Sequence, residues 1–234
     1  EHTKGGGPMK KAAAKKPAAG AKRGAGECLI GAGSRFEGRL ACEGLIRIEG
    51  DCSGGVESAG TIVVANLPYY ISTPLLFRLL DQRDRFPRLV LMLQNEVADR
   101  LVAKPGSSDY GVLSVMAQYA AEITKAFRVS AQCFRPRPEV GSAVVLLKTR
   151  ERRELTSEEE PKFAALVKAA FAHRRKTLVN SLRDEGYDQS GIIGALERLA
   201  LSPSVRAEVL SLEQFIRFTR FILSPAESRD VRLA

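Results

Sequence analysis

Apolar residues between positions 72 and 148 alternate between helical spacing and short continuous runs. A helical pattern predicts an amphipathic helix, whereas a short apolar run bounded by turn residues predicts a strand. Strands that alternate with helices indicate a βαβ arrangement and therefore an α/β fold. The expected elements are a helix opened by Pro74, a strand over 88–94, helices over 96–102 and 111–121, and strands over 123–130 and 142–148.

The pattern changes after residue 150. A charged connector over 150–160 is followed only by segments with helical apolar spacing, so we expect a small all-α domain. The four expected helices cover 163–171, 178–182, 192–199 and 212–223.

The β-branched run 61–64 predicts a strand, and Asn66-Leu67-Pro68-Tyr69 follows it directly. A purine N6 amine is a poor nucleophile because its lone pair is delocalised, so an enzyme that methylates it must desolvate and orient it. The Asn66 carbonyl and the backbone carbonyl before the Pro68–Tyr69 bond can each accept one N6 hydrogen, and Tyr69 offers a ring for stacking. The alternative is a strand followed by an ordinary X-Pro turn.

Further motifs follow this segment in a fixed order. With them, the chain from about residue 63 to about residue 224 resembles the ribosomal RNA adenine dimethyltransferases, which dimethylate N6 of adjacent adenines in small-subunit rRNA. The motifs are the runs 64–72 (VANLPYYIS), 94–100 (QNEVADR), 109–114 (DYGVLS), 134–138 (FRPRP) with 142–145 (SAVV), and 174–178 (RRKTL).

The resemblance implies the distal half of a Rossmann-like class I methyltransferase domain followed by a helical RNA-binding domain. It implies S-adenosyl-L-methionine as cofactor, with Asn66 beside it, and Asn66, Pro68 and Tyr69 as catalytic residues. Phe134 is expected to pack on the other face of the target base. Asn95, Glu139 and Val179 stand where the family commonly has basic residues, which places some RNA contacts in doubt.

The basic run His173-Arg174-Arg175-Lys176 opens one of the expected helices. In the resembling family this domain grips rRNA, so Arg174, Arg175 and Lys176 are expected to contact backbone phosphates, which position RNA without reading its sequence. The alternative is a solvated helix end, because clustered charges commonly face water.

The family's first hundred residues, which carry a Gly-rich loop and strand-end carboxylates for the cofactor, are largely missing here. Residues 30–33 (IGAG) followed by Glu49 imitate a Gly loop and a strand-end acid. However, Gly38 and Gly44 disfavour the helix that should lie between them. Sixteen residues between Glu49 and Asn66 are also too few for a further strand, acid and helix. We therefore expect no working cofactor loop and impaired methyl transfer.

Residues 36–38, 42–44 and 48–50 repeat an apolar-Glu-Gly or Cys-Glu-Gly unit every six positions. Six residues is the step of a parallel β-helix, in which each short strand points one apolar side chain inward. The segment 27–64 resembles the start of a bactofilin domain, a bacterial β-helical protein that forms filaments. The alternative is a Gly-rich loop with chance spacing. About two rungs are too few to stand alone.

Both patterns are cut at the same strand, near 62–65, which suggests a gene fusion, a deletion or an assembly error. The loss of the preceding strands predicts an unpaired edge and an uncovered apolar surface on the strand that ends at Asn66. Self-association through that edge or the β-helix segment is therefore expected. The expected parts are a disordered basic tail over 1–26, the β-helix fragment over 27–64, a partial methyltransferase domain over 65–150 and a helical RNA-binding domain over 151–234.

Charge is concentrated in the tail. Residues 1–26 hold seven Lys and Arg against one Glu, which is +6 of the net +9. The tail lacks the apolar stretch of a secretory signal, and no apolar run approaches membrane-spanning length, so a cytoplasmic protein with no need of a membrane is expected. The four cysteines form no Cys-x-x-Cys pair, and neither His has a partner at ligand spacing, so no metal is expected.

Three functions fit these observations. The first is an S-adenosylmethionine-dependent rRNA adenine dimethyltransferase, a ribosome-biogenesis enzyme that acts on the small subunit. The second is an inactive RNA-binding remnant that keeps Asn66, Tyr69 and Phe134. The third is a bactofilin-like structural protein, whose hallmark is filaments.

Overall fold

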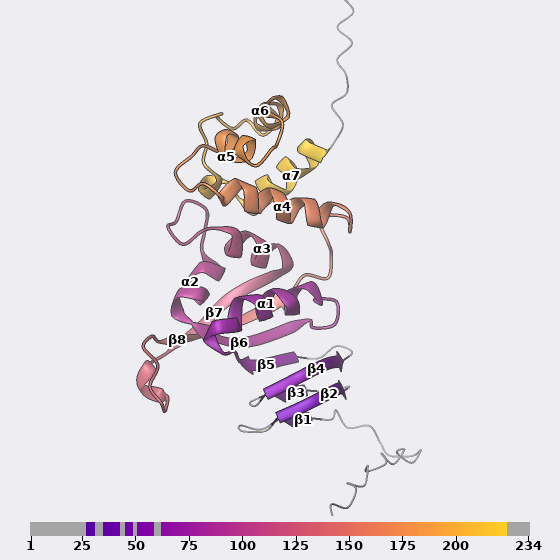
Figure 1. Cartoon of the computed structure of the whole chain (residues 1–234), viewed down its shortest axis with the longest axis vertical. Coiled ribbons are helices and arrows are strands. Elements are labelled where there is room, and N and C mark those ends of the chain that lie inside the picture. Colours follow the sequence, from indigo (N-terminus) through magenta and orange to yellow (C-terminus); the bar gives the residue numbers. More distant parts are fainter. Residues whose placement is uncertain (1–26, 31–34, 43–44, 49–50, 59–61, 224–234) are drawn as a thin grey trace, which may run out of the picture.

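The computed structural model describes residues 27–30, 35–42, 45–48, 51–58 and 62–223 (Figure 1). The helical part lies at one end, the sheet with three helices in the middle, and the N-terminal strands at the other end. The strands are β1 (Glu27–Ile30), β2 (Arg35–Cys42), β3 (Leu45–Ile48), β4 (Asp51–Ser58), β5 (Ile62–Asn66), β6 (Arg88–Gln94), β7 (Ala121–Val129) and β8 (Ser142–Thr149). The α-helices are α1 (Ser72–Asp81), α2 (Asn95–Val102), α3 (Val112–Ala120), α4 (Glu159–Phe171), α5 (Leu178–Asp184), α6 (Gln189–Arg198) and α7 (Leu212–Leu223).

The main sheet has the order β1-β3-β5-β6-β8-β7. The first four of these strands are parallel, β8 runs antiparallel to β6, and β7 runs antiparallel to β8. Between β5 and β8 the chain alternates strands with helices, so the α/β prediction is confirmed for this part. The fold therefore brings the carboxyl ends of β5 and β6 to the edge where β8 begins.

One face of the sheet is buried under α1, α2 and α3. The side chains of β6 show why: Leu89, Leu91 and Leu93 are fully buried, and the alternate residues are not. Leu76 of α1 and Leu101 of α2 are fully buried in the same cluster. This period of two on the strand and three to four on the helices is what a sheet face packed on helices requires.

A second apolar cluster holds the helical part together. Phe163 of α4 and Phe215 and Phe218 of α7 are fully buried at its centre. α3 contributes to both clusters, since its Leu113 and Ala117 face the sheet and its Val115 and Tyr119 face the helices. The predicted all-α segment is thus packed directly on the α/β part.

Charged groups also join the two parts. Glu160 of α4 pairs with the buried Arg83, which follows α1, and with Arg153 at 3.1 Å. Its Oε1 also accepts a hydrogen bond of 2.8 Å from the Tyr119 hydroxyl. Burial, followed by the bond to Glu160, raises the pKa of Tyr119 to about 12. A shared carboxylate therefore fixes α4 against α3 and the end of α1.

The expectation that β5 leaves an unpaired edge is wrong. Ile46, Arg47 and Ile48 of β3 pair in parallel with Val63, Val64 and Ala65 of β5. β1 pairs with β3 in the same sheet, while β2 and β4 form a separate parallel pair. Backbone groups on that side of β5 are therefore satisfied by β3, and the open edge lies at β1.

The remaining differences from the expected elements are small. α1 begins at Ser72 rather than Pro74, α4 begins at Glu159 inside the expected connector, and β7 begins at Ala121. The basic run 173–176 lies in the turn before α5 instead of opening the helix, because Thr177 caps α5 by accepting the Asn180 N–H at 3.3 Å. The expected disordered tail over 1–26 lies outside the described residues.

Candidate functional site

Asn66 is the last residue of β5 and is exposed at the carboxyl edge of the sheet. β6 ends beside it at Gln94, and Ser142 opens β8 opposite Gln94 because β6 and β8 are antiparallel. β7 ends at Val129, which pairs with the same Ser142. Four strand ends thus meet at one edge, where ligands bind in open α/β sheets.

The segment after Asn66 crosses the end of β6. The buried Leu67 donates its N–H to the Met92 carbonyl at 3.2 Å, which anchors the crossing. Tyr69 then reaches β8, where its hydroxyl lies 2.7 Å from the Ser142 hydroxyl. Because Ser142 is fully buried, this hydrogen bond fixes the half-buried Tyr69 ring in one place at the sheet edge.

Pro68 is exposed, and its carbonyl accepts the Ile71 N–H at 3.2 Å in a short 3-10 turn over Tyr69–Ile71. A carbonyl oxygen has two lone pairs, so this one keeps a free acceptor site. The Asn66 side chain supplies a second acceptor at the same corner. The two acceptors expected to hold an N6 amine are thus two positions apart in the chain, and both residues are exposed.

Phe134 lies in the connection between β7 and β8, which leaves and rejoins the sheet at this same edge. Its N–H donates to the Ala131 carbonyl at 3.3 Å, after a 3-10 turn whose Ser130 hydroxyl caps the Gln132 N–H. The Phe134 side chain is only half-buried. The structure therefore brings the loop of Phe134 to the sheet edge of Asn66 and Tyr69. We call Asn66, Pro68, Tyr69 and Phe134 the adenine corner.

The same edge contains a polar atom with no partner. Asn95 donates its backbone N–H to the Gly141 carbonyl at 3.0 Å, yet its side-chain Oδ1 is buried without a hydrogen bond among the described residues. A Cβ on Gly141 would lie 2.7 Å from the Asn95 Nδ2. Asn95 stands where the resembling family commonly has a basic residue, and here it is packed against the backbone that closes the Phe134 loop.

The three predicted RNA-binding cations do not act as one cluster. Arg174 donates to the Ser108 carbonyl at 2.9 Å, across to the loop before α3. Lys176 binds Asp184 at 2.5 Å, and the pKa of that carboxyl is lowered chiefly by this hydrogen bond. Arg175 is exposed and, among the described residues, makes no ion pair.

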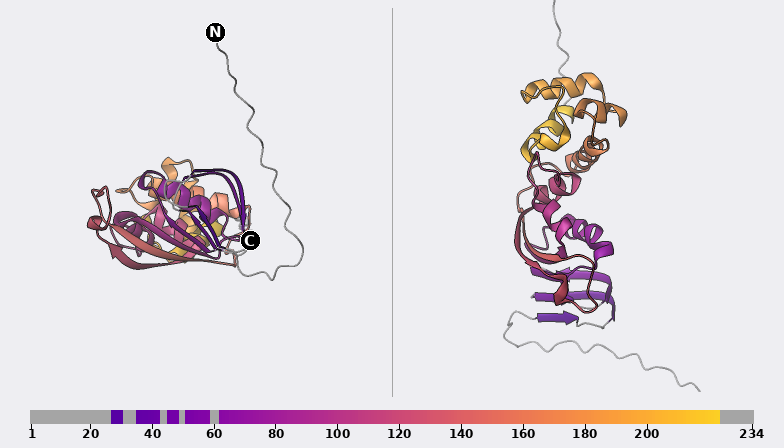
Figure 2. Two further views of the ribbon diagram at one scale, coloured as in Figure 1. Left: turned by 90° about the horizontal axis from the view of Figure 1, so that it is seen from below. Right: turned by 90° about the vertical axis from the view of Figure 1, so that its left-hand side faces the viewer.

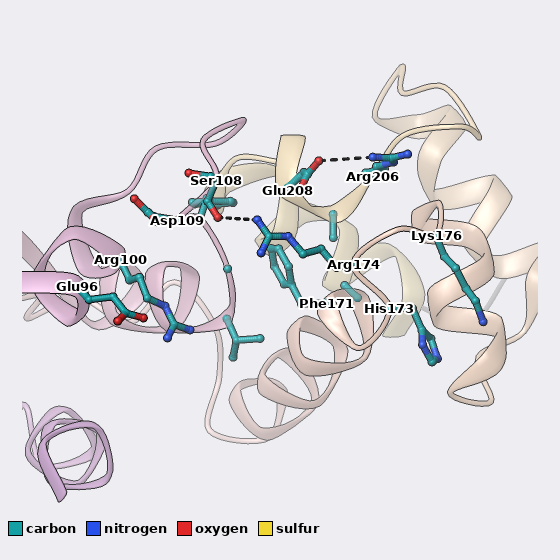
Figure 3. Close-up of a pocket in the computed structure, with 15 residues that line it drawn as sticks. Glu96, Arg100, Ser108, Asp109, Phe171, His173, Arg174, Lys176, Arg206 and Glu208 are labelled. Atoms are coloured by element: carbon teal, nitrogen blue, oxygen red, sulfur yellow. Dashed lines mark hydrogen bonds and ion pairs between the residues drawn. The ribbon is translucent and has the colours of Figure 1, made fainter. Parts of the chain in front are cut away.

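A cleft of about 430 Å³ lies between α2, the loop before α3 and the basic turn (Figure 3). Arg100, Arg174 and Arg206 line it with Glu96, Asp109 and Glu208, so its wall carries mixed charge. Tyr110 and Phe171 contribute an aromatic floor, their rings 6.1 Å apart, and burial raises the pKa of Tyr110 to about 12. That Arg100 and Arg206 line one cleft could not be recognised from sequence, since they are 106 positions apart.

The cleft and the adenine corner are distinct places joined by α2. α2 begins at Asn95 beside Gly141, and its next turns present Glu96 and Arg100 to the cleft. The predicted cations Arg174 and Lys176 line the cleft, whereas no residue of the adenine corner does.

The strand order does not place the strand before the predicted Gly loop next to β5. In nucleotide-binding sheets the strand before the Gly-rich turn lies next to the strand at which the order reverses. Here the strand followed by Gly31 is β1, and β3, which precedes Glu49, separates it from β5. Residues 31–34 and 49–50 themselves lie outside the described residues.

No cluster of metal-ligating side chains occurs among the described residues. Within the described part of the chain, no helix combines the length and apolar character needed to cross a bilayer.

Comparison with known proteins bears on this geometry. Residues 57–222 match the family model described as ribosomal RNA adenine dimethylase. The chain is 46% identical over 158 residues to "Ribosomal RNA small subunit methyltransferase A" of Moorella thermoacetica, which covers 68% of this chain and 55% of that protein. It is also 46% identical over 168 residues to the protein of that name from Geobacter sulfurreducens, covering 71% and 61%. The matches thus span well under two thirds of these relatives' length.

Solved structures show the same fold. A dimethyladenosine transferase from Plasmodium falciparum aligns with a TM-score of 0.61 at 22% identity, covering 80% of this chain and 90% of that one. The 23S rRNA methyltransferase ErmE aligns with a TM-score of 0.53 at 20% identity, covering 71% and 72%. With the family match over most of its length, the chain belongs to the ribosomal RNA adenine dimethylase family.

Proposed function

We propose that this chain binds small-subunit rRNA and holds a flipped-out adenine at the adenine corner. The observation that carries the proposal is the 2.7 Å bond between the Tyr69 and Ser142 hydroxyls. It fixes an aromatic ring at the sheet edge, beside exposed acceptors on Asn66 and Pro68. A flipped base is bound by stacking and by hydrogen bonds to its edge, and this corner offers both.

The acceptors suit the N6 amine in particular. That amine has two hydrogens, and Asn66 Oδ1 and the free lone pair of the Pro68 carbonyl provide one acceptor each. With both hydrogens bound, the nitrogen lone pair is turned out of conjugation and toward an incoming electrophile, which is orientation catalysis. Phe134 closes the opposite side of the base.

RNA on either side of the adenine is held by phosphate contacts. Arg175 faces solvent, and Arg174 and Lys176 border the cleft together with Arg100 and Arg206. Contacts of this kind fix position without reading bases. The pre-ribosomal small subunit is the proposed partner, by the family resemblance.

S-adenosylmethionine is the proposed methyl donor, and it would supply an electrophilic methyl group beside Asn66. Because β3 separates the strand before Gly31 from β5, we infer that transfer by this chain alone is impaired. The chain then acts mainly as an RNA-binding member of its family.

A pair of titrations tests the proposal. The first measures binding of a short single-stranded rRNA segment with adenine or with purine, which lacks the N6 amine, at the target position. Wild-type protein should prefer adenine, and Asn66→Ala should reduce the preference while keeping most of the affinity, because the Pro68 carbonyl remains. Equal affinity of the wild-type protein for both RNAs would refute the amine contact.

The second titration is calorimetric, with S-adenosylmethionine added to the folded full chain at low salt and Asn66→Ala as control. The proposal expects no heat. Micromolar binding that Asn66→Ala abolishes would instead establish a working cofactor site and an active methyltransferase.

A bactofilin-like structural role is the second candidate, favoured by the pairing of the N-terminal strands. Glu27 pairs with Leu45, Arg35 with Asp51 and Ile46 with Val63, offsets of 18, 16 and 17 residues, in two alternating parallel sheets. Such regular offsets are typical of a coiled parallel solenoid. Filaments seen by electron microscopy of the purified chain would support this role, and a uniformly dispersed sample would refute it.

A further inference from the structure

The cleft lies where the helical part meets the α/β part, which Figure 2 (right) shows one above the other. Two hydrogen bonds hold its walls together. The Gly106 N–H donates to the Glu208 carbonyl at 2.7 Å, and the Tyr110 hydroxyl donates to the Leu210 carbonyl at 2.9 Å. Its volume of about 430 Å³ lies in the range of small-ligand sites, so the cleft has room for one nucleobase.

The cations on the helical side of the cleft already have partners. Arg174 donates to the Ser108 carbonyl at 2.9 Å, and Lys176 is bound by a carboxylate of α5 at 2.5 Å. Arg206 lies 4.0 Å from Glu208. This wall therefore offers a ligand in the cleft fewer free donors than its composition suggests.

The α/β side of the cleft carries charges without partners. Glu96 and Arg100 of α2 and Asp109 of the loop before α3 are exposed, and none of them makes an ion pair among the described residues. Glu96 and Arg100 are four residues apart, the spacing at which opposite charges pair on a helix, yet they form no ion pair with each other. Figure 3 shows both on one side of the cleft, with Phe171 and Arg174 on the other. A carboxylate and a guanidinium are thus free on one helix face, about one turn apart.

A ligand that satisfies both groups must offer donors and acceptors side by side. A phosphate would satisfy only the guanidinium, and a simple cation only the carboxylate. Guanine satisfies both, because its N1–H and N2–H match the two oxygens of a carboxylate while its O6 and N7 accept the guanidinium fork. Adenine instead offers an amine beside N7, which suits a side-chain amide, and pyrimidines have no N7. The free charges therefore favour guanine among the RNA bases.

Phe171 provides a surface on which such a base can stack. Its side chain lines the cleft and is half-buried. The ring is held in place by Tyr110 and Phe215, at centroid distances of 6.1 and 5.8 Å. Proteins that bind single-stranded RNA stack unpaired bases on aromatic rings and read their edges with polar side chains. The cleft combines both kinds of group.

We propose that the cleft binds an unpaired guanine base of RNA, with Glu96 accepting its N1–H and N2–H and Arg100 donating to its O6 and N7. Arg100 then contacts a base rather than a phosphate. RNA as the source of the base rests on the proposed function, whereas the guanine contact does not, since a free guanine nucleotide presents the same edge. No residue of the adenine corner lines the cleft, so the two sites can be tested separately.

The test uses the full chain and labelled oligouridine that carries one central guanine, inosine or 7-deazaguanine, so that no adenine is present. Fluorescence anisotropy should show the guanine RNA bound at least about fivefold more tightly than either analogue, because inosine lacks the N2 amine and 7-deazaguanine lacks N7. Glu96→Gln should remove most of the preference over inosine, and Arg100→Met most of the preference over 7-deazaguanine. Both residues are exposed, so neither change should unfold the chain.

Glu213→Gln is the matched control. Glu213 is exposed on α7 and does not line the cleft, so both preferences should survive its replacement. Equal binding of the guanine and inosine RNAs by the wild-type chain would overturn the proposal. The same loss of preference in Glu96→Gln and Glu213→Gln would also overturn it.

Competition with guanosine monophosphate identifies the source of the base. Displacement of the guanine RNA only at a far higher nucleotide concentration would support RNA as the ligand, whereas displacement at equal concentration would overturn RNA in favour of the free nucleotide. If none of the RNAs binds, calorimetric titration with guanosine and inosine monophosphates tests the base contact alone, and absent or equal heats would overturn it. Because no probe contains adenine, failure here leaves the adenine corner unaffected.

Discussion

The segment 66–69 of the adenine corner and the basic turn 173–176 are both short runs of neighbouring residues. The side chains of the first stay at one sheet edge, whereas those of the second bond to different parts of the molecule. At the corner, β5 ends, Leu67 bonds to β6 and Tyr69 bonds to β8, so consecutive residues stay together at one sheet edge. In the basic turn, Arg174 bonds to Ser108 and Lys176 to Asp184, so neighbouring cations point to different partners. Residues that are neighbours in the sequence therefore stay together in space where hydrogen bonds to neighbouring strands hold their segment in place. They separate where long charged side chains bond to different groups.

The α/β part, which holds the adenine corner, and the helical part, which holds the basic turn, are joined by Glu160, and Glu160→Ala should weaken that junction. The change leaves the buried Arg83 without its carboxylate and removes the acceptor of Tyr119. Loss of one partner of a buried ion pair costs about 3–5 kcal/mol, so urea unfolding should show a decrease of that size in the free energy of unfolding. Arg153→Ala, which removes a more exposed partner of the same carboxylate, should cost less than about 1 kcal/mol. Equal effects of the two changes would contradict the assignment.

Two neighbouring tyrosines test which ring of the adenine corner stacks on a base. Tyr69→Ala should weaken binding of single-stranded rRNA by about 1–3 kcal/mol, the usual worth of a base stack. Tyr70, which is 86% exposed and has no described side-chain partner, supplies the control, and Tyr70→Ala should leave the affinity nearly unchanged. The measurement is fluorescence anisotropy with labelled RNA. A larger loss for Tyr70 would place the stacking surface elsewhere.

A smaller effect should come from the bond that holds the Tyr69 ring. Ser142→Ala and Tyr69→Phe each remove the same hydrogen bond, worth about 0.5–1.5 kcal/mol. If that bond positions the ring, the double variant should bind RNA no more weakly than the worse single variant. Strictly additive losses in this cycle would show that Ser142 and Tyr69 act independently.

The basic turn should give the smallest change, visible in salt dependence. Arg175→Ala should lower the slope of log affinity against log salt by about 1, because it removes one phosphate contact. Lys176→Ala should change the slope less, since Lys176 is already neutralised by Asp184 at 2.5 Å. The opposite ranking would mean that RNA displaces Asp184 from Lys176.

Much of the fold follows from periodicity. The strand over 88–94 and the helix over 212–223 have the predicted bounds, because Leu alternation and a clean amphipathic stripe leave little choice. The start of α1 was missed because Ser72, whose hydroxyl bonds to the Tyr69 carbonyl at 3.1 Å, extends the preceding 3-10 turn into the helix. The pairing of β3 with β5 was not predicted, because the apolar pattern within a strand does not show which strand it pairs with, and these two strands lie on either side of the expected domain boundary.

For the candidate site as well, contacts between neighbouring residues could be predicted from sequence and contacts between distant residues could not. Asn66, Pro68 and Tyr69 could be placed together from sequence because they lie within four consecutive residues. Ser142 could not be recognised as the partner of Tyr69, since 73 residues separate them. The hydrogen bond from Arg174 to the Ser108 carbonyl could not be predicted either, because it depends on how the helical part packs on α3.

The parallel pairing of β3 with β5 has a further consequence for motion. Amides at Val63 to Ala65 lie in an interior strand bonded on both sides, so they should exchange with deuterated solvent only when the sheet opens as a unit. Asn66, which we propose binds the adenine, is the last residue of this strand, so it is attached to a strand that does not fray by itself. The slow-exchanging core then extends from β6 through β5 to β3.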